Sequence, residues 1–146
     1  MDKIELLAPA GNIEALKAAV ENGADAVYLG GKFFNARQNA DNFTSEELKK
    51  SVKFAHQRNV KIYITLNTLL ANEEINSFID YVYELAEAQV DAFIVQDLGI
   101  VYLLKNLLPN IPLHASTQMA IHNYKGIKYL EELGFKRIVL AREVSL

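Results

Sequence analysis

The stretch "ENGADAVYLG" (residues 21–30) decides the fold, because it runs from a helical pattern through a tight turn into an apolar strand. Two further stretches repeat this order, "EAQVDAFIVQ" (residues 87–96) and "ELGFKRIVLA" (residues 132–141). A helix end followed at once by a strand, recurring along a chain, is typical of βα units. The chain is therefore predicted to be an α/β protein.

Six short apolar runs mark the predicted strands. They are rich in Ile, Val, Leu and Tyr, and most do not alternate with polar residues, which indicates burial on both faces of a parallel sheet. Their starts lie about 27 residues apart on average, which matches one unit of a (β/α)₈ barrel of ~250 residues. The runs begin at Ile4, Ala26, Lys61, Ala92, Pro112 and Arg137.

Helical patterns fill the gaps between these runs. Apolar residues recur three or four positions apart over residues 13–20, 48–55 and 75–86, as on one face of a helix. Glu47 stands three residues after Thr44, which predicts a capping box. N-cap residues are expected at Asn12, Thr44, Asn72 and Asn123, and left-handed C-cap residues at Gly23, Asn59 and Gly134.

The spacing of the strands fits a barrel or an open doubly wound sheet. The turn "APAGN" (residues 8–12) lacks the G-x-G-x-x-G pattern, which favours a partial TIM-like (β/α) barrel with about six parallel strands and five helices. Closure takes eight strands, so residues 1–146 are expected to form a single domain that is the N-terminal portion of a longer (β/α)₈-type barrel. Its open edge would favour homo-oligomers.

Composition limits the classes of function. Hydrophobic residues make up 51% and charged residues 23% of the 146 residues, which is ordinary for a globular domain. A net charge of -3 argues weakly against binding of a phosphate backbone by this chain alone. The lack of cysteine excludes disulfides, thiolate nucleophiles and iron–sulfur ligands within these residues. The apolar run at the start is too short for a signal peptide or a membrane span, so a cytoplasmic location is expected.

The stretch "IPLHASTQMAIHN" (residues 111–123) crowds polar side chains just after a predicted strand. In a βα barrel the reactive groups gather at the C-terminal ends of the strands, and the ends of the other predicted strands here are polar as well. A substrate pocket is expected there. Its candidate substrate-binding residues are Asn12, Arg37, Asn67, Gln96, Asp97, Ser116, Gln118 and Arg142.

His114 and Glu143 are the candidate catalytic residues, each as a general acid or base if a substrate lies within ~3 Å. His114 and Ser116 share a strand face, so a Ser–His pair oriented by Asp97 is an alternative, although no nucleophile elbow is present. Asp97 has a purely structural explanation as a helix cap. No spacing of the H-E-x-x-H kind occurs, so no metal site is predicted.

Several uncommon blocks occur in order along nearly the whole chain. Together they resemble the N-terminal part of peptidase family U-32, the collagenase-like peptidases. The blocks are "ELLAPAGN" (5–12), "GADAVYLGGKFFNAR" (23–37), "LNTLL" (66–70), "IVQDLG" (94–99), "LHASTQM" (113–119) and "GFKRIVLAREVSL" (134–146).

This resemblance implies a TIM-like domain at the start of a longer peptidase that acts on a peptide or small polar substrate. Other relatives resemble RNA-modifying or hydroxylation proteins that carry an iron–sulfur cluster, and the family's cysteines lie downstream of the matched region. No cofactor is therefore expected in this chain. Two alternatives stay open: a fragment of an iron–sulfur-dependent RNA or cofactor hydroxylation protein, with nucleic acid as partner, and a non-catalytic, self-associating fragment.

Overall fold

The computed structural model describes residues 4–36 and 42–144. Within these residues, six strands form one sheet, and each strand runs parallel to the next along the chain. The expected α/β fold, a partial TIM-like barrel with six parallel strands and five helices, is confirmed. The strands are β1 (Leu7–Ala10), β2 (Ala26–Leu29), β3 (Lys61–Leu66), β4 (Ala92–Val95), β5 (Leu113–Ala115) and β6 (Arg137–Ile138).

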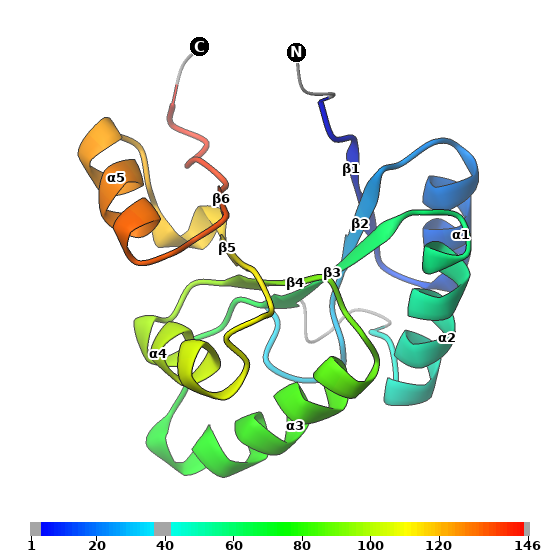
Figure 1. The fold of residues 1–146 in the computed structure, drawn as a ribbon, viewed down its shortest axis with the longest axis horizontal. Helices are drawn as coiled ribbons and strands as arrows, with labels where there is room; N and C mark the ends of the chain where they lie inside the picture. The colour runs from blue at the N-terminus through cyan, green and yellow to red at the C-terminus, as the bar shows by residue number, and fades with distance from the viewer. Residues whose placement is uncertain (1–3, 37–41, 145–146) are drawn as a thin grey trace.

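The helices cover the convex side of the curved sheet, and both chain ends lie on the same side of the molecule (Figure 1). In the described ranges the outer edges of β1 and β6 pair with no further strand. Self-association through these edges stays a prediction. The helices are α1 (Ile13–Glu21), α2 (Ser45–His56), α3 (Ile75–Glu87), α4 (Leu98–Leu107) and α5 (Tyr124–Glu132), with short 3₁₀ turns η1 (Asn72–Glu74) and η2 (Thr117–Met119).

A repeated turn leads from four of the helices into the next strand. Each turn has one residue in the left-handed region, followed by a buried apolar residue that enters the core. Gln89 carries no sequence signal for this conformation, whereas the other three positions are the predicted ones. The left-handed residues are Gly23, Asn59, Gln89 and Gly134, with φ of 93°, 57°, 62° and 86°.

Most of the predicted helix starts are confirmed. The side chains of Asn12 and Asn123 cap α1 and α5, and Thr44 forms the capping box of α2 with Glu47. Asn72 is not an N-cap, because it lies inside the turn η1. The carboxylate of Glu74 accepts a hydrogen bond from the backbone N–H one residue before Asn72, at 2.9 Å, and so the turn begins earlier than predicted.

Three strand boundaries also differ from the prediction, and the smallest difference is at β5, which begins at Leu113 instead of Pro112. The first strand begins at Leu7 and not at Ile4, whose side chain is 91% exposed. The last strand pairs only over Arg137 and Ile138, whereas the apolar run continues to Ala141. Hydrophobic composition alone therefore overestimates pairing at the two edges of the sheet, where one side has no partner strand.

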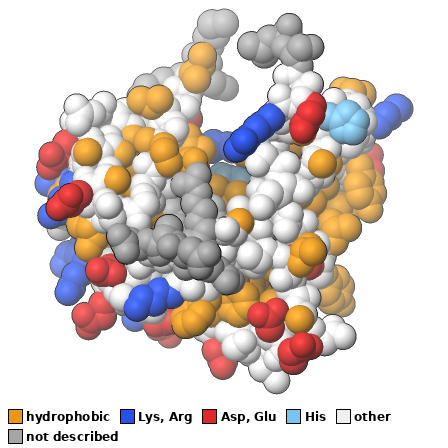
Figure 2. Space-filling model, turned by 180° about the vertical axis from the view of Figure 1, so that it is seen from behind, with side chains coloured by type: hydrophobic (Ala, Val, Ile, Leu, Met, Phe, Trp, Pro, Cys, Tyr) orange, Lys and Arg blue, Asp and Glu red, His pale blue; other side chains and the backbone are white. Residues whose placement is uncertain are grey.

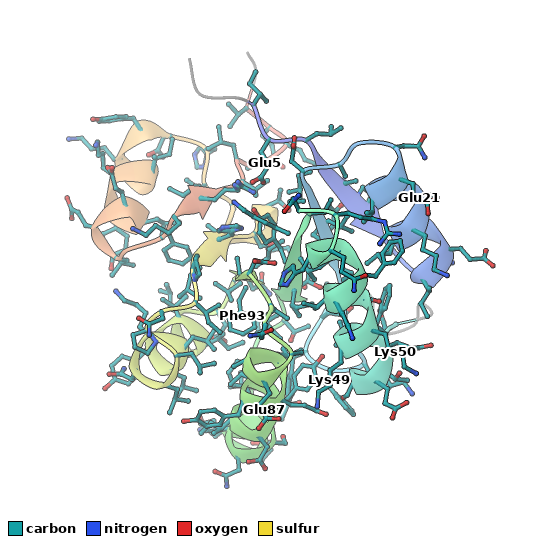
Figure 3. The ribbon with its side chains drawn as sticks, turned by 45° about the vertical axis from the view of Figure 1, so that its right-hand side comes forward. Glu5, Glu21, Lys49, Lys50, Glu87 and Phe93 are labelled. Atoms are coloured by element: carbon teal, nitrogen blue, oxygen red, sulfur yellow. The ribbon has the colours of Figure 1, made fainter. Side chains whose placement is uncertain are left out.

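The sheet separates two apolar clusters, and this explains the continuous apolar runs. Phe93 and Val95 of β4 belong to the large core between sheet and helices, and Phe93 is fully buried there (Figure 3). Ala92 and Ile94 of the same strand belong to a smaller cluster on the concave face. Since successive residues of a strand point to opposite faces, both faces need apolar side chains.

Aspartates directly before β2 and β4 accept hydrogen bonds from backbone N–H groups at or next to the start of the neighbouring strand. Asp25 accepts a hydrogen bond from the backbone N–H of Leu6 at 2.8 Å, and Asp91 accepts one from Ile62 at 2.7 Å. Asp91 also lies 2.8 Å from Nε2 of His56. These two aspartates occupy the same position in the repeated stretch, so the repeat encodes a contact between neighbouring strands.

Replacing Asp91 with alanine is expected to lower the free energy of unfolding by about 1–2 kcal/mol, because the N–H of the buried Ile62 loses its acceptor. Asp91→Asn keeps an oxygen that can accept this bond and should retain most of the stability. Urea unfolding at pH 7 measures both variants. Equal midpoints for Asp91→Ala and the wild type would contradict the assigned role.

Candidate functional site

A cavity of about 380 Å³ lies at the carboxyl ends of the strands, on the concave side of the sheet. Its size falls within the range of about 300–1,000 Å³ that is typical of small-molecule sites. Seen from behind, the molecule is hollowed, and a basic side chain reaches over the hollow (Figure 2). Apolar residues of the inner face form part of the wall: Leu7, Tyr28, Ile94 and Val139.

Polar residues that follow three of the strands also line the cavity. They lie one to four residues after the ends of β3, β5 and β6, where a βα barrel gathers its reactive groups. Four of the eight candidate substrate-binding residues thus meet in one cavity, although up to 75 residues of sequence separate them. These four are Asn67, Ser116, Gln118 and Arg142.

The other candidates lie elsewhere. Asn12 caps α1 and borders a separate surface hollow. Asp97 caps α4, and its second oxygen accepts a hydrogen bond from the backbone N–H of Leu70 at 3.1 Å. Gln96 is half-buried after β4 and does not line the cavity, and Arg37 lies outside the described residues. Asp97 therefore has a structural role that joins two loops of the mouth.

Several lining residues are absent from the list of candidate substrate-binding residues, although they lie at or after the ends of predicted strands. Thr65 and Ile94 lie within apolar runs, and the sequence does not show which alternate residues of a doubly buried strand face inward. Asn35 belongs to the loop after β2, and its side chain is almost fully buried (1% exposed). Its place after a predicted strand end could be inferred from the sequence, but its burial could not, because an asparagine in a long loop is usually exposed.

Two polar side chains of the cavity carry hydrogen-bond donors without a partner among the described residues. Arg142 is the one charged residue among the described lining residues, and its guanidinium has no ion-pair or hydrogen-bond partner among them. The side-chain amide of Gln118 likewise has no hydrogen-bond partner among the described residues. The hydroxyl of Thr65, by contrast, donates to the backbone carbonyl of Leu29 at 3.2 Å. This lining suits a neutral or anionic ligand that carries several acceptors, such as carbonyl groups.

His114 lies on the concave face of β5 but does not line the cavity. Its side chain is buried (5% exposed) and packs edge-to-face on Tyr63, with 4.7 Å between ring centroids. Burial, aided by the nearby positive charge of Arg137, lowers the pKa of His114 to about 4, so the imidazole is neutral at pH 7. Its role as a general acid or base stays a prediction, as does that of the exposed Glu143.

A charged network closes the opposite, amino-terminal end of the concave face. Glu5 lies 2.7 Å from Nη1 of Arg137, accepts a hydrogen bond from the hydroxyl of Tyr63 at 3.0 Å, and lies 3.9 Å from Nζ of Lys61. Figure 3 shows Glu5 near the ends of the two outermost strands. The network thus links the segment before β1 to β6 across the concave side, and it stabilises the curvature that forms the cavity.

Burial and hydrogen bonding together shift the pKa values in this network. Desolvation raises the pKa of Glu5, but the hydrogen bonds from Arg137 and Tyr63 outweigh it and hold that pKa below its usual value. Burial and the adjacent Glu5 raise the pKa of Tyr63 to about 12. The network therefore keeps a carboxylate paired with an arginine at neutral pH.

The described residues contain no group of three or more His, Cys, Asp or Glu placed to hold a metal ion. The chain has no cysteine, and iron–sulfur clusters are held chiefly by cysteine thiolates. These residues therefore do not fit such a cluster, whose ligands would have to come from other residues. None of the described helices is both long enough and apolar enough to cross a membrane.

The fold and the site define a class of protein: an α/β half-barrel with a polar cavity at the carboxyl ends of parallel strands. The sequence profile of peptidase family U32 matches residues 11–146. The chain belongs to peptidase family U32, as its sequence blocks predicted. A solved U32 peptidase structure has the same fold, with a TM-score of 0.73 at 15% identity over 96% of this chain and 61% of that one.

Two bacterial proteins are similar in sequence to nearly the whole of this chain. The "tRNA hydroxylation protein P1" of Bacillus subtilis is 46% identical over 143 residues, which cover 98% of this chain and 34% of the relative. The "23S rRNA 5-hydroxycytidine C2501 synthase" of Escherichia coli is 44% identical over 144 residues, covering 99% of this chain and 21% of the relative. The chain thus spans about a third or less of the length of these relatives.

Proposed function

We propose that this chain is the substrate-recognition part of an RNA hydroxylation protein, and that its cavity takes one pyrimidine nucleoside of a tRNA or rRNA. The observation that carries the proposal is a cavity of about 380 Å³ whose described lining combines apolar side chains with amides, hydroxyls and the guanidinium of Arg142. The names of two relatives, at 46% and 44% identity, support the reaction and the class of substrate.

Chemistry on a base requires the base to leave its stack, and a pocket then recognises the exposed edge by hydrogen bonds. A pyrimidine presents carbonyl oxygens on that edge, which match the unoccupied donors of Gln118 and Arg142. The wall formed by Tyr28 and Ile94 offers apolar surface to the ring. The site therefore has the two components that recognition of a single base needs.

The net charge of the chain suggests that it binds the base and not the phosphate backbone of the RNA. Strong binding to RNA rests on lysine and arginine contacts to phosphates, and a net charge of -3 supplies few of them in excess. Contacts to the phosphate backbone then fall to other parts of the protein, as do the ligands of any iron–sulfur cluster. The described cavity would then bind the nucleoside only.

A chimera tests this proposal. When this chain replaces the matching region of the Bacillus subtilis relative, hydroxylated nucleoside in cellular tRNA should persist, and Arg142→Gln should reduce it about tenfold through loss of a charged donor. Lys136→Gln, an exposed substitution at the other end of β6, is the matched control. Mass spectrometry of digested tRNA gives the readout.

Binding of uridine and cytidine to the purified chain, followed by NMR, gives a second measurement that does not depend on the chimera. Shifts confined to cavity residues support the proposal. A folded chain that binds neither nucleoside at millimolar concentration, together with a chimera that lacks hydroxylation, would overturn it.

The family description favours a second candidate, a peptidase. In that case His114 or Glu143 would act as general acid or base on a peptide held at the strand ends. Ser116 and His114 both lie on the concave face, but the Ser116 hydroxyl accepts a hydrogen bond from the backbone N–H of Gln118 at 3.3 Å, so it caps η2. Cleavage of collagen-derived peptides that is lost in Glu143→Gln would favour this candidate over RNA hydroxylation.

A further inference from the structure

We propose that Asn67 is the specificity-determining residue of the cavity: its carbonyl oxygen holds the loop after β2 in place, and its amide nitrogen donates to an acceptor on the bound pyrimidine. This inference rests on the proposed function for the identity of the ligand. Its structural half, the contact with the loop, does not depend on that function.

The loop contact joins residues that are far apart in sequence. Oδ1 of Asn67, directly after β3, accepts a hydrogen bond from the backbone N–H of Ala36 at 3.1 Å, across 31 residues of sequence. Both residues line the cavity. The side chain of Asn67 therefore connects the end of a central strand to the loop that borders the mouth.

The same contact fixes which way the amide points. A backbone N–H can only donate, so the atom that faces Ala36 must be the oxygen of Asn67. The nitrogen Nδ2 lies on the other branch of the planar amide, and it has no hydrogen-bond partner among the described residues. A residue of the cavity wall thus keeps two N–H donors free in a defined orientation.

The loop on which Asn67 acts is tightly packed at its base. The side chain of Asn35 donates to the backbone carbonyl of Gly31, and a Cβ at Gly30 would lie 2.9 Å from Cγ of Asn35. Asn35 is only 1% exposed. Since this segment has little room to shift, the hydrogen bond to Ala36 places Asn67 in one position relative to the loop.

A donor at this position selects between ligands. A pyrimidine that turns a carbonyl oxygen or an unprotonated ring nitrogen toward Nδ2 completes the hydrogen bonding of the amide, whereas an amino group there meets another donor. The free-energy cost of leaving a buried polar group without a partner is larger than the net gain from one good hydrogen bond, so the mismatched ligand loses more affinity than the matched ligand gains. Cytidine also carries acceptors, at O2 and N3, so the selection depends on position 4 of the ring. With Nδ2 opposite that position, Asn67 favours the carbonyl oxygen of uridine over the amino group of cytidine.

Two variants test the contact with the loop and the contact with the ligand separately. Asn67→Asp keeps an oxygen for the N–H of Ala36 but replaces the free donor with an acceptor, and Asn67→Leu removes both functions at similar size. Asn106→Asp, in the last turns of α4 and far from the mouth, is the control for the same chemical change. Hydrogen exchange of the Ala36 amide reports the loop contact, and NMR titration with uridine and cytidine reports the ligand contact.

The expected results differ for each variant. Asn67→Asp should keep the protection of the Ala36 amide yet bind uridine about tenfold more weakly, while Asn67→Leu should lose both. Unchanged uridine binding in Asn67→Asp would overturn the ligand contact, and unchanged protection in Asn67→Leu would overturn the loop contact. If the wild type binds neither nucleoside, the proposed function fails and the specificity fails with it, but the exchange data still decide the loop contact.

Discussion

Replacing Gly31 with alanine is expected to lower the free energy of unfolding by about 3 kcal/mol, and the additional change Tyr81→Phe is expected to restore most of it. A Cβ at Gly31 would lie 1.8 Å from the hydroxyl oxygen of Tyr81. No such contact is sterically allowed, so either the loop or the tyrosine must move.

The tyrosine has little freedom to move. Its side chain is 6% exposed and packs against the rings of Phe33 and Phe34, with centroid distances of 5.6 and 5.9 Å. The Tyr81 hydroxyl has no hydrogen-bond partner in the described structure, and burial raises its pKa above the usual value. A hydroxyl in this state costs stability, so Tyr81→Phe alone should be neutral or stabilising by about 1 kcal/mol.

Urea unfolding of the wild type, both single variants and the double variant forms a complete double-mutant cycle. A coupling energy of about 2 kcal/mol between the two sites is expected. Gly11→Ala is the matched control, because a Cβ there meets no atom within 4 Å. A double variant no more stable than Gly31→Ala would show that the clash with the hydroxyl is not the cause.

The contact between Gly31 and Tyr81 shows where the sequence stops being informative. The repeated turns and apolar runs predict the order and direction of the strands, because local patterns determine those elements. No local pattern links Gly31 to a tyrosine 50 residues later. Such contacts depend on how the loop after β2 packs on α3, which only the folded structure reveals.

The same limit applies to the candidate site. Asn67, Ser116, Gln118 and Arg142 could be predicted, because polar residues directly after parallel strands meet at one end of a barrel. His114 was predicted by the same rule, yet it lies one layer deeper, on the strand itself. The position of a strand's end is uncertain by a residue or two, and one step of two residues moves a side chain from the mouth into the interior.

Below pH 6.5 the protein is expected to lose stability because of His114, by about 2 kcal/mol at pH 5 and about 3 kcal/mol at pH 4. The pKa of His114 is about 4 in the folded protein, against 6.5 for the unperturbed group. Between these two pH values the unfolded chain binds a proton at this histidine and the folded protein does not. The stability is therefore fully present above pH 6.5, is lost progressively as the pH falls from 6.5 to 4, and changes little further on account of His114 below pH 4.

His114→Phe isolates this effect, because phenylalanine keeps a ring against Tyr63 and cannot take up a proton. It also removes Nδ1, which is buried without a hydrogen-bond partner in the described structure, so the variant should match the wild type at pH 7 within about 1 kcal/mol. Urea unfolding from pH 7.5 to 4.5 should then show a shallower decline in the variant than in the wild type.

The exposed His122, changed to glutamine, serves as the control for loss of any histidine and should retain the wild-type decline. Carboxylates also lose their pairing in acid in all three proteins, and Glu5 is the one whose charge acts on His114. The difference between the curves therefore reports the imidazole together with its interaction with Glu5. Parallel curves for His114→Phe and the wild type would mean that the folded protein binds a proton at His114 as readily as the unfolded chain does. The imidazole would then titrate near neutral pH in the folded protein, as suits a general acid or base.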